Sequence, residues 1–198
     1  MTKRQSYMLQ KRLFDIIVSL ILITVTIPIM VIISVFVYVD LGRILFKQER
    51  IGQFGIPFYV YKFPTRKKGS TYEEQEVDFN NSRLTSLGAR LRKYKLDELP
   101  QLFQVLGGKM SIIGPRPELP TYIKYHEELR NELLQYKTGL IDLAVIHYLD
   151  EDEVLRFKEN PREYYCTHLL RKKINLSLET QRYQLKTWAL IFRRTKII

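Results

Sequence analysis

The feature that most constrains this chain is an uncharged apolar run near its N-terminus, from Ile16 to Val39. About two dozen residues, at roughly 1.5 Å of helical rise each, are enough to cross the roughly 30 Å hydrocarbon core of a bilayer. The run is too long for the apolar region of a cleavable signal peptide, and no small-residue cleavage site follows it. We therefore expect a membrane helix that stays in the mature protein.

Two features indicate that this helix turns back instead of crossing. Basic residues flank the run on both sides, so the positive-inside rule assigns both ends to the cytoplasm. Pro28, in the middle of the run, removes a backbone hydrogen bond and bends or breaks the helix. The alternative is a kinked helix that spans the bilayer. The sequence favours a re-entrant anchor over residues 1–42 and a cytoplasmic-face domain over residues 43–198. The flanking basic residues are Lys3, Arg4, Lys11, Arg12, Arg43, Lys47 and Arg50.

The rest of the chain predicts a single basic domain. No Gly/Ser- or Pro-rich linker divides the 198 residues, and the net charge of +11 predicts attraction to phosphate in nucleic acid, anionic lipid or a charged substrate. No nucleic-acid-binding signature is present, so we rank nucleic acid last. The lone Cys166 excludes a disulfide framework and is interpreted as buried and structural.

Periodicity predicts an α/β fold that is predominantly helical. Two β-rich runs, 44–49 and 58–63, flank a glycine-bearing turn and predict a hairpin, whereas the polar stretch 66–82 predicts a loop. Apolar residues at helical spacing follow from Leu99, and Asn160-Pro161 resembles a helix start. The final apolar stripe, 185–192, includes Trp188 among basic residues, and it either lies in the bilayer interface or packs on the domain.

Two adjacent carboxylates, Asp97 and Glu98, stand just before the helical pattern that begins at Leu99. A helix start favours the ionised form of a carboxylate, which is suited to attack phosphorus or to hold a divalent metal. Simple helix capping is the alternative interpretation. The rigid turn GPRP presents the planar guanidinium of Arg116 as a hydrogen-bond donor for phosphate. This favours phosphoryl chemistry at a membrane. Further basic residues just upstream are Arg90, Arg92, Lys93 and Lys95.

Four segments in the first 120 residues resemble the bacterial sugar transferases, small monotopic phosphoglycosyl transferases that start glycan assembly on polyprenyl phosphate. LDELPQL and GPRP occur together, in order and at the spacing of that family, so the resemblance is specific. The segments are KRLFD at 11–15, QERIGQFGIPFYVYKF at 48–63, RLTSLGARLRKYKLDELPQLFQVL at 83–106 and GKMSIIGPRPE at 108–118.

The resemblance implies transfer of a sugar 1-phosphate from a UDP-sugar to polyprenyl phosphate, the first membrane step of glycan assembly, at the cytoplasmic face of the bacterial inner membrane. It implies that Asp97 is the nucleophile of a covalent intermediate, and that Glu98 binds Mg²⁺ or assists proton transfer, with Asp97 as a second metal ligand. Arg92 and Arg116 would bind substrate phosphates. Lys62 is a further candidate, or else a solvated strand lysine.

Some positions limit what the resemblance implies. Arg12 and Asp15 match family positions that are interpreted as structural or as contacts near the lipid phosphate. The chain departs from the family at Pro64–Arg66 and at Tyr136–Ile146, where only Thr138 and Gly139 are clearly kept. A catalytically inactive membrane scaffold is the alternative function. The sequence does not specify the sugar, the polyprenol, the glycan pathway or whether a homo-oligomer forms.

Overall fold

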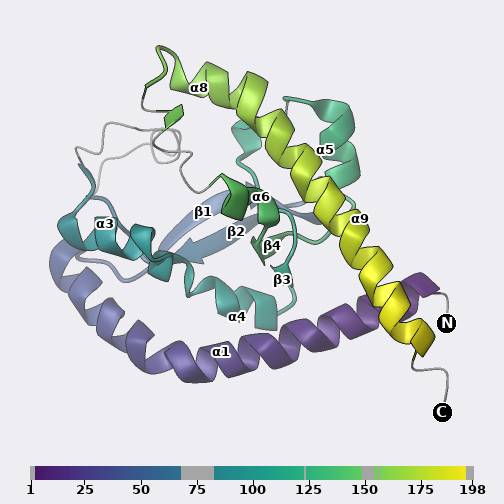
Figure 1. Ribbon diagram of the computed structural model, residues 1–198. Coiled ribbons are helices and arrows are strands. Elements are labelled where there is room, and N and C mark those ends of the chain that lie inside the picture. Colours follow the sequence, from purple (N-terminus) through teal and green to yellow (C-terminus); the bar gives the residue numbers. More distant parts are fainter. Residues whose placement is uncertain (1–2, 68–82, 123, 149–153, 156, 195–198) are drawn as a thin grey trace.

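The computed structural model describes residues 3–67, 83–122, 124–148, 154–155 and 157–194, and it is mostly helical with two small sheets (Figure 1). This confirms the predominantly helical α/β class. The helices are α1 (Lys3–Leu41), α3 (Ser86–Lys93), α4 (Gln101–Leu106), α5 (Glu127–Leu133), α6 (Leu143–His147), α8 (Pro161–Tyr164) and α9 (Leu170–Arg194). The strands are β1 (Phe46–Ile51), β2 (Pro57–Lys62), β3 (Ser111–Ile113) and β4 (Gly139–Ile141). Single turns of tighter or wider helix are η1 (Gln53–Gly55), η3 (Leu96–Glu98), η4 (Pro120–Tyr122) and η5 (Tyr165–Leu169).

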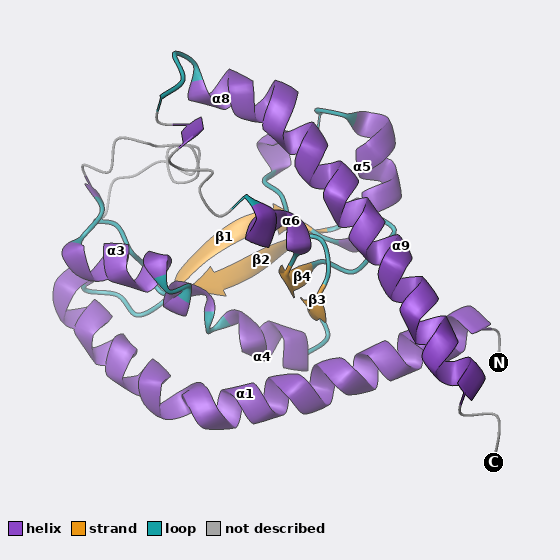
Figure 2. Ribbon diagram, in the orientation of Figure 1, coloured by secondary structure: helices purple, strands orange, loops and turns teal. Residues whose placement is uncertain are grey.

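Figure 2 shows the two sheets at the centre of the molecule, between α1 on one side and α9 on the other. The predicted hairpin is confirmed: β1 and β2 are antiparallel, in a register that runs from Phe46 opposite Lys62 to Ile51 opposite Pro57. Strands β3 and β4 are parallel. The residue after β3, Gly114, lies against the first residue of β4, Gly139. The two backbones are so close that a Cβ atom on Gly139 would lie 2.1 Å from the Gly114 nitrogen.

Helix α1 is bent but not broken. It is one continuous helix with Pro28 inside it, and Figure 1 shows its axis change direction partway along. The hydroxyls of Thr24, Thr26 and Ser34 each donate to a carbonyl four residues earlier. Such side-chain bonds bend helices, and so does the loss of the backbone hydrogen bond that proline cannot form. We call residues 3–27 the first arm of α1 and residues 29–41 the second arm.

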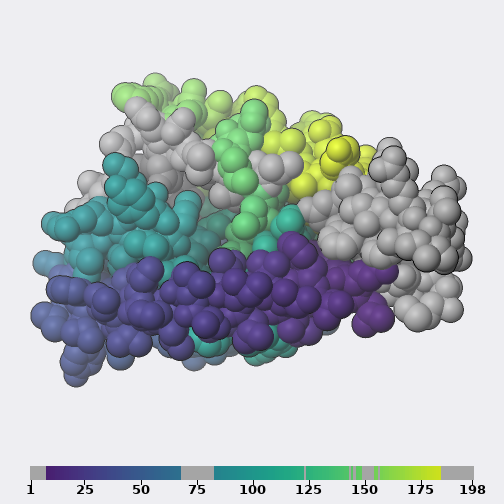
Figure 3. Space-filling view, turned by 60° about the horizontal axis from the view of Figure 1, so that its bottom comes forward, coloured from purple at the N-terminus to yellow at the C-terminus, as the bar shows by residue number. Residues whose placement is uncertain are grey.

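One face of α1 packs on the domain along both arms. The first arm buries Ile23 in a cluster with Val60 and Leu102, and the second arm buries Val37 in a cluster with Phe63. The opposite face is apolar and exposed, and Figure 3 shows α1 as a band along one face of the molecule. By length and composition, the helix from Met8 to Leu41 could cross a membrane. Its exposed apolar residues include Leu13, Ile17, Leu20, Ile21, Val25, Val31, Ile32, Val35 and Phe36.

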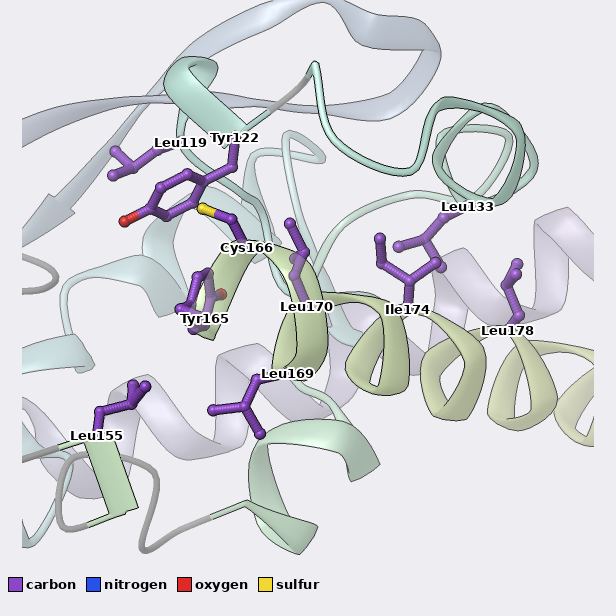
Figure 4. Close-up of a cluster of buried hydrophobic side chains, with 10 residues drawn as sticks. All are labelled: Leu119, Tyr122, Leu133, Leu155, Tyr165, Cys166, Leu169, Leu170, Ile174 and Leu178. Carbon is purple, nitrogen blue, oxygen red and sulfur yellow. The ribbon is translucent and has the colours of Figure 1, made fainter. Parts of the chain in front are cut away.

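A third cluster joins α5, α9 and the chain between them, and it includes Cys166, which is buried as expected (Figure 4). The predicted helix start is confirmed, because the Asn160 side chain accepts from the Glu163 N–H at 3.2 Å and Pro161 is in the first turn. The predicted loop lies almost entirely outside the described residues. The side chains of the final stripe, 185–192, also lie outside them, so its two interpretations remain open.

Candidate active site

The two carboxylates lie on η3, a single turn that precedes α4. The turn begins after Lys95, whose φ of 56° places it in the left-handed region and reverses the chain out of α3. Asp97 and Glu98 are both buried, each 8% exposed. The N–H of Phe63, just after β2, donates to the Asp97 carbonyl at 2.9 Å. The hairpin therefore fixes the backbone of the pair, which lies one turn ahead of the helix predicted to begin at Leu99.

Glu98 is fixed by two cations. The Arg116 guanidinium donates to both carboxylate oxygens, at 2.9 and 3.4 Å, and the Lys62 Nζ lies 3.9 Å from Oε1. Burial by itself raises the pKa of Glu98, but Arg116 and Lys62 outweigh burial, so the net pKa lies well below the usual glutamate range. The same pair raises the pKa of Arg116. Glu98 is therefore ionised at neutral pH.

Asp97 has a different environment from its neighbour. Its Oδ1 is buried and has no hydrogen-bond partner within the described part of the chain. Burial and the adjacent Glu98 raise the pKa of Asp97, while Lys62, Arg92 and Lys95 oppose the rise. The pKa of Asp97 is therefore shifted upward, against the direction expected from a helix start, because desolvation and Glu98 outweigh that effect. A desolvated carboxylate is more basic, and more basic oxygens are better nucleophiles.

The Lys62 side chain is only 16% exposed and lies 3.9 Å from the Glu98 carboxylate, which contradicts its interpretation as a solvated strand lysine. Burial lowers the pKa of Lys62 to about 7, with Glu98 opposing the shift and Arg50 adding to it. Arg50 was not predicted as a site residue. It is 3% exposed and donates to the Pro117 carbonyl at 3.0 Å, so it supports the turn that presents Arg116.

Asp142 also escaped the sequence analysis. One of its oxygens accepts from the Arg116 backbone N–H at 3.0 Å and from the Ser177 hydroxyl at 2.6 Å. The other accepts from the Ala144 N–H at 3.1 Å, which caps α6. This single buried carboxylate therefore connects the GPRP turn to α6 and α9. Its signal in the sequence was an Asp before a short apolar run, a common helix start.

The remaining predicted residues divide into two places. Arg92, half-buried on α3, is close enough to Asp97 to oppose part of the rise in the Asp97 pKa. Arg12 donates to the carbonyls of Val105 and Leu106 at 2.7 and 2.6 Å, at the end of α4. Asp15 accepts from the Ser111 hydroxyl and the Ile112 N–H, each at 2.9 Å. Arg12 and Asp15 therefore join α1 to the domain, which favours their structural interpretation.

The fit of Mg²⁺ can be judged from the oxygens that are available. No cluster of three or more His, Cys, Asp or Glu side chains occurs among the residues that the structure describes. Asp97 offers an oxygen without a partner, whereas both oxygens of Glu98 already accept from Arg116. Mg²⁺ is commonly bound by one or two carboxylates with substrate phosphates and water. The unpartnered Asp97 oxygen therefore fits Mg²⁺ that arrives with a phosphorylated substrate, and Glu98 would bind the ion only while also accepting from Arg116.

Two carboxylates surrounded by arginine and lysine, on a chain with an apolar anchor helix, define a site suited to phosphorylated substrates at a membrane. Comparison of the sequence agrees, because the profile of the family described as bacterial sugar transferase matches residues 6–186. The chain belongs to this family.

Two of the relatives have names that refer to transfer of a sugar phosphate and to undecaprenyl phosphate. The chain is 34% identical over 145 residues to a UDP-glucose:undecaprenyl-phosphate glucose-1-phosphate transferase of Xanthomonas campestris, covering 69% of this chain and 30% of that protein. It is 34% identical over 159 residues to an undecaprenyl-phosphate galactose phosphotransferase of Salmonella typhimurium, covering 72% and 33%. An uncharacterized sugar transferase of Bacillus subtilis is 36% identical over 146 residues, covering 71% and 69%. The chain thus spans about a third of the first two relatives.

Proposed function

We propose that this protein is a phosphoglycosyl transferase that moves a sugar 1-phosphate from a UDP-sugar to polyprenyl phosphate through a covalent intermediate on Asp97. The observation that carries the proposal is the difference between the two carboxylates. Glu98 is locked in an ion pair, whereas the Asp97 Oδ1 is desolvated and has no hydrogen-bond partner among the described residues. The relatives named above act on UDP-sugars or undecaprenyl phosphate by name, which supports the choice of substrates.

The reaction balances in two displacements at phosphorus. An Asp97 oxygen attacks the β-phosphorus of the UDP-sugar, forming an acyl phosphate, and the bond from that phosphorus to the bridging oxygen breaks to release UMP. A phosphate oxygen of the acceptor lipid then attacks the same phosphorus. This second step frees the Asp97 carboxylate and leaves the sugar on a polyprenyl diphosphate.

The cations around the pair have roles that follow from their charge. Lys62, Arg92 and Arg116 would bind phosphate oxygens and lower the repulsion between the incoming diphosphate and the carboxylates. Mg²⁺, bound at Asp97 and Glu98 with the substrate, would add further neutralisation of the diphosphate. Glu98 remains ionised and holds Arg116 at the site in place of acting as the attacking group.

We further propose that α1 is re-entrant, with both ends at the cytoplasmic face of the bacterial inner membrane. A straight helix of 39 residues would be about 58 Å long, far more than the hydrocarbon core. Both arms contact the same domain: Asp15 near the N-terminal end accepts from Ser111, and Val37 near the C-terminal end packs with Phe63. These contacts favour one side for both ends, because a spanning helix would separate them.

The chemical proposal is tested by trapping the intermediate. Enzyme mixed with a UDP-sugar and no acceptor lipid, then quenched in acid, should carry one phosphosugar on the peptide that contains Asp97. The variant Asp97→Asn should lose UMP release by on the order of a thousandfold or more, whereas Glu98→Gln should retain slow turnover. If the wild type turns over normally and no adduct forms on this peptide, the two-step mechanism is wrong. If no UDP-sugar in a screen yields UMP, the inactive scaffold takes its place.

The topology is tested by cysteine labelling in intact cells. Cysteine introduced at Ser6 or at Gln53 should resist a membrane-impermeant maleimide added from outside and should react after permeabilisation. Labelling of only one of the two positions in intact cells would show that α1 spans the membrane.

A further inference from the structure

A second charged cavity lies away from the Asp97 and Glu98 pair. Its volume is about 280 Å³, and it forms where the first arm of α1, the η1 turn, the segment after α5 and helix α9 meet. Neither Asp97 nor Glu98 lines it. The polar lining includes Lys11, Arg12, Asp15, Lys137 and Gln181.

The lining carries an excess of positive charge. Three cations, Lys11, Arg12 and Lys137, face a single carboxylate, Asp15. The hydrogen-bond acceptors that these cations contact outside the lining are mostly neutral carbonyls, such as that of Gly108, which accepts from the Lys137 Nζ at 2.9 Å. Burial lowers the pKa of Lys137, and the neighbouring Arg12 lowers it further. Uncompensated cations in a partly buried cavity are stabilised by a bound anion.

Gln181 supplies an independent sign of a ligand. Its side chain is 2% exposed, and its Nε2 has no hydrogen-bond partner within the described residues. Buried amide donors are nearly always paired, because leaving one unpaired costs the free energy of its desolvation. The donor belongs to a residue that lines the cavity, so an acceptor placed there would satisfy it.

The remaining walls indicate that the ligand has an apolar part. Met8 and Phe54 line the cavity and are 53% and 60% exposed. The cavity also lies beside residues 8–15 of α1, where the charged start of the helix gives way to the apolar run. In an anchored protein this boundary is the level of lipid headgroups.

We propose that this cavity binds the phosphoryl headgroup of a membrane lipid, with Lys137 and Gln181 donating to phosphate oxygens and the lipid chain leaving over Met8 and Phe54. A phospholipid and a polyprenyl phosphate share this chemistry. Neither Asp97 nor Glu98 lines the cavity, and the proposal does not require that the proposed mechanism be correct.

The test measures lipid retention by the full-length protein in detergent. Wild-type protein should bind dioleoyl phosphatidic acid more tightly than dioleoyl phosphatidylcholine, in native mass spectrometry and as a rise in Tm. Lys137→Gln should weaken phosphatidic acid binding by about tenfold or more, because a hydrogen bond to a charged group is lost. Gln181→Leu should weaken it several-fold. Lys172→Gln, which removes an exposed lysine of α9 outside the cavity, is the matched control and should bind like the wild type.

Competition separates the sources of the headgroup. Bound phosphatidic acid is titrated with submicellar undecaprenyl phosphate or with a second phospholipid. If undecaprenyl phosphate displaces it at the lower concentration, the site belongs to the acceptor lipid. If the phospholipid does so, the site belongs to a phospholipid. Displacement by millimolar inorganic phosphate would show that the headgroup alone is recognised. The proposal is wrong if wild-type protein does not discriminate phosphatidic acid from phosphatidylcholine. It is equally wrong if Lys137→Gln and Gln181→Leu, both folded by circular dichroism, bind phosphatidic acid like Lys172→Gln.

Discussion

Replacing Arg116 by Gln should leave the buried Glu98 carboxylate without its main partner. Breaking a buried ion pair by removing one member typically costs about 3–5 kcal/mol. The Arg116 side chain is 26% exposed, and Lys62 stays 3.9 Å from Glu98, so we take a lower value. We expect a loss of about 2–3 kcal/mol, which for a domain of this size lowers Tm by roughly 4–12 °C.

The double variant Arg116→Gln/Glu98→Gln separates stability from catalysis. It removes both charges, so it should recover most of the lost stability, while its UMP release should stay well below that of the wild type. The loss should also depend on pH. The pKa of Glu98 is depressed in the wild type, so the stability from the pair is present above the ordinary glutamate pKa and is lost on acidification below it. In Arg116→Gln, burial favours protonation of Glu98, which removes the unpaired buried charge. The difference in Tm between the wild type and Arg116→Gln should therefore be smaller at pH 5 than at pH 8.

Thermal unfolding followed by circular dichroism, at constant detergent and lipid, measures these differences. Arg182→Gln is the control, because Arg182 forms an exposed ion pair with Glu132, and exposed pairs contribute little. A Tm for Arg116→Gln within the change seen for Arg182→Gln would refute the reasoning. So would a double variant no more stable than the single one.

Two further predictions concern neighbours of the pair. The pKa of Lys62 is lowered to about 7, so kcat/KM for the UDP-sugar should fall as pH rises through about 7, where the ammonium loses its proton. Lys62→Arg should abolish this fall in the pH profile. An unchanged profile in Lys62→Arg would assign the fall to another group. Asp142→Asn should lower Tm by roughly 2–12 °C and reduce kcat/KM, because Asp142 accepts through both of its oxygens and Asn has only one acceptor oxygen, so an NH2 group must face either the Ala144 N–H or the two donors Arg116 and Ser177. Ser177→Ala should have a smaller effect on both, and equal effects would contradict the role given to the Arg116 contact.

Local patterns in the sequence were sufficient for part of this fold. The hairpin and the start of α8 depend on residues within a few positions of one another, and both were predicted. The strands β1 and β2 begin at Phe46 and Pro57, whereas the sequence predicted starts at 44 and 58. The position of Asp97 and Glu98 followed from one short motif.

Other features depend on contacts between distant residues. Arg50 reaches Pro117 across 67 positions, and Asp142 reaches Ser177 across 35, so no local pattern reveals their partners. The pKa values of the two carboxylates differ because burial and Arg116 act on them unequally, and neither effect is visible in the letters. Adjacent acidic residues look equivalent in a sequence, whereas their surroundings give them opposite shifts.

The packing of the second arm of α1 connects this arm to the backbone of the proposed nucleophile. Val37 belongs to the same buried cluster as Phe63, and the Phe63 N–H donates to the Asp97 carbonyl at 2.9 Å. The opposite face of this arm is apolar and exposed, so in the proposed membrane setting its angle would depend on the thickness and packing of the surrounding lipid. A change in that angle would reach the reacting carboxylate through a single side chain and one hydrogen bond. If α1 is anchored as proposed, the lipid would therefore act on the Asp97 site as well as hold the protein at the membrane.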